Sequence, residues 1–110
     1  MPKSPRANKT NQAKLDLAEI AEYYGGESLD LELRFIEAAE DAFSKLAAMP
    51  EKGAKRKYFH PKLKSLRMWP IPHFPKILIF YNPQENGVEV VRVLHSSRDI
   101  DTLFTKGRKP

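Results

Sequence analysis

The sequence predicts an α+β fold: an N-terminal helical hairpin packed on a small antiparallel β-sheet of three to four strands, with a short C-terminal helix. Apolar residues recur at helical spacing through residues 14–48, and two apolar runs, 76–81 and 88–94, flank the turn dipeptide Asn86-Gly87. A chain of 110 residues is large enough for one modest core. We therefore expect a single domain over residues 1–110, with a polar arm at 1–12 and a basic tail at 105–110.

The two helices follow from periodicity and from residues that start and stop helices. The first is expected at 14–24 and should end at Gly25-Gly26, because glycine readily takes the left-handed conformation of many helix C-caps. Ser28 is an expected N-cap for the second helix, which carries acidic residues in its first turn, where the helix dipole favours them. This helix should run to about Ala48, because Pro50 cannot continue it.

The second half of the chain has the pattern of a small sheet. Residues 65–71 are an expected strand, and the prolines of WPIPHFP (69–75) indicate a bulge, an edge or a turn. KILIFY (76–81) predicts a central strand buried on both faces, and 88–94 predicts its partner. Regular alternation would place Val88, Val90, Arg92 and Leu94 on one face of that partner. Ser96 and Asp99 have capping-box spacing for a last helix that ends near residue 104.

Charge is distributed unevenly along the chain. Residues 15–51 hold ten acids and two bases, whereas residues 52–84 hold eight bases and no acid. A basic surface of this kind favours nucleic acid or an acidic protein partner. The alternative is a solvated, lysine-rich loop that binds nothing.

Several classes of protein and site are disfavoured. The absence of cysteine excludes disulfides, thiolate-bound metals and cysteine nucleophiles. His60, His73 and His95 lack the spacing of a metal site, so we expect no metal and no cofactor. We see no signal peptide and no membrane-spanning run, and we expect a cytoplasmic protein.

Four segments taken in order resemble the RelE/ParE superfamily of bacterial toxins, and the ParE branch most of all. They are AKLDLAEIAEYY (13–24), RFIEAAEDAFSKLAAMPEKG (34–53), LKSLRMWPIPHFPKILIFY (63–81) and GVEVVRVLHSSRDIDTLF (87–104). The resemblance implies a helical hairpin on an antiparallel sheet and a toxin of a type II toxin–antitoxin module, held inactive by a cognate antitoxin. The family's first strand is usually apolar in alternation, whereas SPRANKTN stands there in this chain, which predicts a thin or frayed edge strand.

Two functions remain open on the sequence. By resemblance to the ParE branch, we expect a toxin that binds and inhibits DNA gyrase; its expected target-binding residues are Lys55, Arg56, Lys57, Arg67, Trp69 and Arg98. The alternative is a RelE-type endonuclease that cleaves mRNA on the ribosome, with Arg67, Arg92, His95 and Arg98 as catalytic residues and His95 or Tyr81 moving protons. Against it, Leu103 and Phe104 stand where many RNA-cleaving members place a tyrosine. An inactive homologue that only binds its antitoxin is a third possibility.

The stretch RVLHSSRDID (92–101) also has a purely structural interpretation. His95 can anchor a strand end, Asp99 can cap a helix, and Arg92 can pair with a carboxylate. No glycine-framed nucleophile elbow surrounds Ser96 or Ser97, which disfavours Ser-His-Asp hydrolysis. We therefore expect a structural junction here unless the chain is a nuclease.

Overall fold

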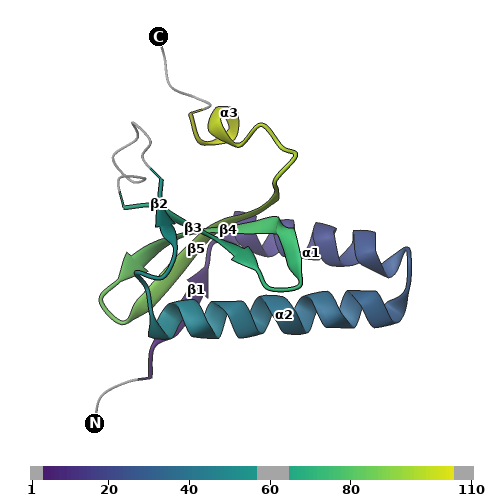
Figure 1. The fold of residues 1–110 in the computed structure, drawn as a ribbon, viewed down its shortest axis with the longest axis horizontal. Coiled ribbons are helices and arrows are strands. Elements are labelled where there is room, and N and C mark those ends of the chain that lie inside the picture. Colours follow the sequence, from purple (N-terminus) through teal and green to yellow (C-terminus); the bar gives the residue numbers. More distant parts are fainter. Residues whose placement is uncertain (1–3, 57–64, 106–110) are drawn as a thin grey trace.

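A computed structural model describes residues 4–56 and 65–105 (Figure 1). Two antiparallel helices cover one face of a five-stranded sheet, and a short helix packs against the other face. The α+β class, the helical hairpin and the short C-terminal helix are therefore confirmed. The elements are β1 (Arg6–Lys9), α1 (Asn11–Gly25), α2 (Leu29–Ala48), β2 (Ala54–Lys55), β3 (Arg67–Ile71), β4 (Phe74–Gln84), β5 (Gly87–His95) and α3 (Ile100–Thr105).

Helix α1 begins three residues earlier than expected, because Thr10 is its N-cap. The Thr10 hydroxyl accepts a hydrogen bond from the Ala13 N–H at 3.0 Å and donates one to the Val91 carbonyl at 2.8 Å. This residue therefore starts the helix and ties it to β5. At the other end, Gly26 is the C-cap with a φ of −64°, so the expected left-handed glycine was wrong.

Helix α2 begins and ends where the sequence predicts. The Ser28 hydroxyl accepts from the Leu31 N–H at 3.0 Å, and Asp30 and Glu32 occupy the first turn. The helix ends at Ala48, two residues before Pro50. Its buried face supplies Phe35, Ala39, Ala42, Phe43, Leu46 and Ala47.

The sheet has the strand order β1-β5-β4-β3-β2, with β1 parallel to β5 and all other neighbours antiparallel. It exceeds the expected three to four strands because two short edge strands form. Strand β1 lies in the expected polar arm and is joined to β5 by backbone bonds such as Thr10 N–H to Val90 O, 3.0 Å. At Gly87, φ is 129° and an added Cβ would collide with the Arg6 backbone, so only glycine permits this close approach.

Strand β5 carries a bulge that changes which side chains face the helices. Tyr81 pairs with Val90 but Phe80 pairs with Arg92, which leaves Val91 as an extra residue. Val88, Val90 and Val93 lie in the core beneath the helices, whereas Leu94 packs toward α3. The predicted regular alternation was therefore wrong beyond Val90.

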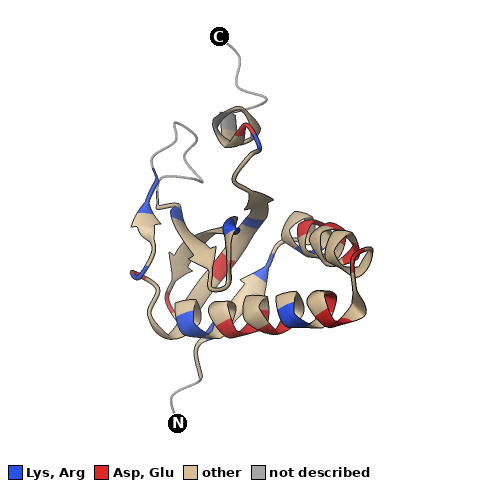
Figure 2. Cartoon of the chain, turned by 45° about the vertical axis from the view of Figure 1, so that its right-hand side comes forward, with Lys and Arg blue, Asp and Glu red and all other residues tan. Residues whose placement is uncertain are grey.

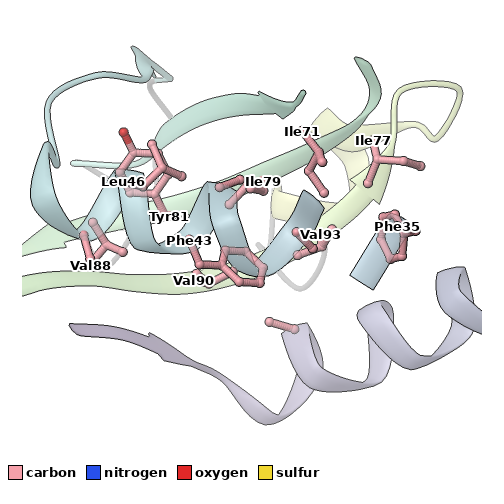
Figure 3. Packing of buried hydrophobic residues seen from close by; sticks show 14 of the residues in the cluster. Phe35, Phe43, Leu46, Ile71, Ile77, Ile79, Tyr81, Val88, Val90 and Val93 are labelled. Carbon is pink, nitrogen blue, oxygen red and sulfur yellow. The ribbon is translucent and has the colours of Figure 1, made fainter. Parts of the chain in front are cut away.

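Strand β4 is buried on both faces, as its apolar run predicts. Ile77, Ile79 and Tyr81 join the main core under α1 and α2 (Figure 3). Phe80 points the other way into a smaller cluster with Leu66 and Leu94, where residues of α3 pack.

The proline-rich corner at 69–75 contains both a bulge and a turn. The register shifts between Pro70 and Ile71, and Ile71 then pairs with Phe74 across a two-residue turn. The second turn residue, His73, has a φ of 71°, which costs a non-glycine residue conformational energy.

Helix α3 starts later than expected and has a different cap. The Asp99 carboxylate accepts from the Thr102 N–H at 3.3 Å and from the Thr102 hydroxyl at 2.6 Å. These hydrogen bonds lower the pKa of Asp99 below its ordinary value. Ser96 instead donates its N–H to the Lys76 carbonyl, 2.7 Å, so the capping box at Ser96 was wrong and the capping role of Asp99 is confirmed.

Candidate functional site

The turn at residues 50–53, which leads into the basic segment, is held by two side chains from neighbouring strands. The Tyr81 hydroxyl donates to the Pro50 carbonyl and accepts from the Gly53 N–H, both at 2.8 Å. Arg67, opposite Tyr81 in the sheet, donates to the carbonyls of Glu51 at 3.0 Å and Gly53 at 2.6 Å. The turn is therefore fixed to β3 and β4.

Gly53 is required by this close packing. A Cβ at this position would lie 2.6 Å from the Tyr81 hydroxyl oxygen and 2.8 Å from the Met68 carbonyl oxygen. Tyr81 itself is fully buried, and this burial raises the pKa of its phenol, although the hydrogen bond from Gly53 and the charge of Arg67 oppose the shift. At neutral pH the hydroxyl is thus protonated and can donate to Pro50.

Cationic and aromatic side chains lie on this anchored turn and on the adjacent strands β2 and β3. The Lys52 ammonium lies 4.7 Å from the centre of the half-buried Trp69 ring, a cation–π contact. Lys55 is exposed on β2, and the half-buried Arg56 donates its backbone N–H to Leu66 O at 2.7 Å. We call Lys52, Lys55, Arg56 and Trp69 the basic turn surface. Lys57, another expected target-binding residue, lies outside the described residues.

A cavity of about 490 Å³ adjoins the basic turn surface. Its lining comprises Pro50, Glu51, Lys55, Ser65, Arg67, Pro83 and Gln84. The Arg67 side chain is only 14% exposed, and its guanidinium lies 3.9 Å from the Glu51 carboxylate besides bonding the turn carbonyls. Its charge is therefore largely engaged within the protein, and Lys55 is the exposed cation of this cavity.

Arg98 lies at a different place in the fold. It is exposed in the segment between β5 and α3, where its N–H donates to the His95 carbonyl at 3.0 Å. His95 pairs with Ile77 of β4, and Arg67 pairs with Tyr81 of the same strand. The end of β5 that precedes Arg98 is therefore four residues, about 13 Å, from the level of Arg67 along the sheet. Strand β2 and the segment before α3 nevertheless both lie on the side of the molecule away from α2 (Figure 1).

Among the expected nuclease residues, Arg92 has a carboxylate partner within the fold. Arg92 forms a two-point ion pair with Asp16 of α1, with N–O distances of 2.8 and 3.0 Å. Asp16 also accepts the Val93 N–H at 3.0 Å and is only 5% exposed. Sequence reasoning foresaw a carboxylate partner for Arg92 but did not identify Asp16, which looks like one more acid of an acidic helix.

Two further groups of the RNA-cleavage alternative are also accounted for by local structure. His95 is half-buried, and its Nδ1 accepts from the Ser97 N–H at 3.0 Å, which places the ring in the turn after β5. The Phe104 ring packs 5.0 Å from Phe80 in the smaller cluster. The aromatic ring that replaces the RNA-cleaving members' tyrosine is thus a packing residue.

Figure 2 shows that acidic residues gather on α1 and α2, with a few basic residues on α2, and that basic residues also mark β2 and the segment before α3. Within residues 4–56 and 65–105, no cluster of three or more His, Asp or Glu side chains is arranged to hold a metal ion. No helix in this part of the chain is long and apolar enough to cross a membrane.

Comparison with known proteins identifies the class of this molecule. The profile of the ParE toxin of type II toxin–antitoxin systems, parDE, matches residues 8–100. A solved structure described as a chromosomal ParDE toxin–antitoxin system from P. aeruginosa has a TM-score of 0.65, with 15% identity, over 83% of this chain and 95% of the other. No curated protein sequence matches.

The chain therefore belongs to the ParE toxin family of type II toxin–antitoxin systems, which confirms the resemblance seen in the sequence. The structural likeness independently supports the fold.

Proposed function

We propose that this ParE-family toxin binds and inhibits DNA gyrase through the basic turn surface, without catalysing a reaction. In this proposal the 110-residue chain acts as one toxin domain in the cytoplasm. The observation that carries the binding mode is the anchoring of the 50–53 turn by Tyr81 and Arg67. A turn held in place presents its cations with little ordering entropy to lose on binding.

The engagement of Arg67 and Arg92 also favours binding over RNA chemistry. A catalytic cation must stabilise charge on the reacting phosphate, but the Arg92 guanidinium already faces Asp16, and that of Arg67 contacts the turn. One fold can serve both activities, so the fold does not distinguish gyrase from the ribosome as the target. Our choice of gyrase therefore rests on the resemblance to the ParE branch.

A supercoiling assay with purified gyrase tests the proposal. We expect the toxin to inhibit supercoiling or trap cleaved DNA, and we expect its cognate antitoxin to relieve the effect. Lys55→Glu should weaken inhibition at least severalfold, whereas Lys14→Glu, an equal charge change at an exposed position of α1, should not. Equal loss in both variants would show that net charge, not this surface, matters.

The same experiment separates the alternatives. No gyrase inhibition at high micromolar toxin, together with mRNA cleavage on ribosomes, would establish the endonuclease alternative. His95 and Arg98 would then be the first candidates for catalytic residues. Neither activity, with no growth defect on overexpression, would identify a homologue that binds only its antitoxin.

For the antitoxin, we propose an acid-rich segment that becomes ordered as it binds the toxin. Two features support a surface for it. Leu29, Leu33 and Ile36 are 68%, 53% and 41% exposed and lie on one flank of α2 at spacings of four and three residues. Among residues 4–56 and 65–105, β1 and β2 are the outermost strands of the sheet, so their outer edges suit strand addition.

Calorimetry with the purified antitoxin distinguishes these two surfaces. Leu33→Glu should weaken antitoxin binding at least tenfold if the flank of α2 is used, whereas Lys45→Gln, which makes the same change of net charge on another side of this helix, should not. Unchanged affinity in Leu33→Glu would leave the sheet edges as the antitoxin surface.

A further inference from the structure

A second cavity lies on the acidic side of the molecule, away from the basic turn surface. It has a volume of about 400 Å³ and lies between α1 and the neighbouring ends of β4 and β5. The side chains that matter for its chemistry are Glu19, Tyr23, Tyr24, Glu27, Ile77 and His95. Two carboxylates, two phenol rings and an apolar floor thus meet in one concave site.

Two tyrosine rings form the aromatic wall of this cavity: Tyr24 packs against core residues, and Tyr23 is exposed to solvent. Tyr24 packs against Phe35 and Phe74, with ring centres 5.4 and 5.2 Å apart, so its position is set by the core. Tyr23 meets Tyr24 edge-on at 5.5 Å and is itself 71% exposed. An incoming group can therefore contact an aromatic surface without displacing core residues.

The electrostatic environment of the cavity is negative. Glu19 and Glu27 form no ion pair with any described residue. The site lies at the C-terminal end of α1, where the helix dipole is negative and no basic residue occupies the last turn. The pKa of Tyr24 is raised, first by burial and then by the nearby Tyr23 and Glu27.

Neighbouring cations do not neutralise the cavity. Lys76 and Arg98 lie near Ile77 and His95 along the chain, but neither lines the cavity or forms an ion pair with its carboxylates. The remaining polar lining group, His95, uses Nδ1 to accept the Ser97 N–H.

We propose that this cavity binds the side chain of an arginine carried by a protein partner. A planar guanidinium can stack on the exposed Tyr23 ring while its N–H groups bond the Glu19 or Glu27 carboxylate, and its alkyl stem can contact Ile77. A cavity that combines an aromatic face with carboxylates favours a guanidinium over an anion or a neutral side chain, because only the guanidinium interacts well with both groups. This inference does not depend on gyrase being the target.

The small probe N-acetyl-arginine methylamide tests the proposal on the full-length toxin by NMR titration. We expect millimolar affinity, as for other small surface ligands, with shifts centred on Tyr23, Tyr24 and Ile77. The citrulline analogue has the same shape without the charge and should cause no such shifts. Equal shifts with both compounds, or none with arginine, would overturn the proposal.

Two variants show whether the effect belongs to this cavity. The double substitution Glu19→Gln and Glu27→Gln should weaken binding up to about fivefold, because it removes whichever carboxylate makes the exposed ionic contact. Glu22→Gln removes an equivalent exposed charge of α1 that does not line the cavity, and should leave the affinity unchanged. Equal weakening in Glu22→Gln would assign the binding to general acidity of the helix. Because all three glutamates are exposed, these variants should keep the parent melting temperature.

Discussion

Replacing Arg92 with alanine tests whether the Asp16–Arg92 pair supports the fold. The substitution would leave the Asp16 carboxylate in a site where it is 5% exposed, without its cationic partner. Breaking a buried ion pair typically costs about 3–5 kcal/mol. Arg92 is itself 20% exposed, so water screens part of the interaction, and we expect the lower end, about 3 kcal/mol.

The assay is thermal and urea unfolding followed by circular dichroism. A loss of about 3 kcal/mol should lower the melting temperature by about 10–20 °C in a domain of this size. Arg34→Ala is the matched control, because Arg34 pairs with Asp30 at the same 2.8 Å, but these side chains are 71% and 73% exposed. That variant should lose about 0.5 kcal/mol or less.

A double variant tests the mechanism of the loss. Replacing Asp16 with leucine and Arg92 with methionine removes both charges, and should recover part of the stability lost in Arg92→Ala. Recovery should be incomplete because the Val93 N–H then loses its acceptor. If Arg92→Ala kept the melting temperature of the parent protein yet lost toxicity, the structural role would be refuted, and Arg92 would be a candidate catalytic or target-binding residue.

Three further perturbations have defined outcomes. Tyr81→Phe should cost about 2 kcal/mol in urea unfolding, because buried groups of Pro50 and Gly53 lose their partner. Since its folded pKa is raised, the stability due to Tyr81 is present below pH 10.0 and falls as the pH rises above it. His73→Gly should stabilise the protein by up to about 1 kcal/mol and His73→Ala should not, because φ is positive there. The lowered pKa of Asp99 predicts that capping of α3, present above pH 3.8, is lost on further acidification, as amide NMR signals of α3 would show.

Each of these predictions has a result that would contradict it. Tyr23→Phe, at a 71% exposed tyrosine, should be neutral; a similar loss there would show that the turn anchor is not responsible. Equal stability of the glycine and alanine variants at 73 would argue against backbone strain. Asp99→Asn retains an N-cap without a charge, so acid sensitivity of α3 that persisted in this variant would have another source.

Much of the helical layer could be predicted because its signals are local. Ser28 precedes an amphipathic run and Pro50 follows it, and both ends of α2 fall where these residues indicate. The burial of β4 on both faces also follows from its unbroken apolar run. The start of α1 was missed because Thr10 is followed by polar residues, so no apolar periodicity marks its first turn.

The candidate site was foreseen only in part. The basic composition of residues 52–57 and the turn-rich setting of Trp69 drew attention to the segment in which we propose the target-binding surface. The roles of individual cations could not be predicted, because Arg67 and Lys55 are equivalent charges in the sequence. In the fold, Arg67 donates to the turn carbonyls, whereas Lys55 is exposed. The acid–aromatic cavity was not anticipated, because it joins α1 to β4 and β5.

The sequence by itself determined the α+β class, the helical hairpin, the doubly buried strand and the toxin family, because periodicity, capping residues and motif order act over short stretches. Tertiary structure alone decided that the edge strand β1 forms and pairs in parallel with β5, that Val91 is bulged, and that Asp16 pairs with Arg92, 76 residues away. The polar stretch Arg6–Lys9 has no apolar alternation, and it becomes a strand because β5 supplies partners for its backbone groups. Contacts between distant segments depend on how whole elements pack, and no local pattern encodes them.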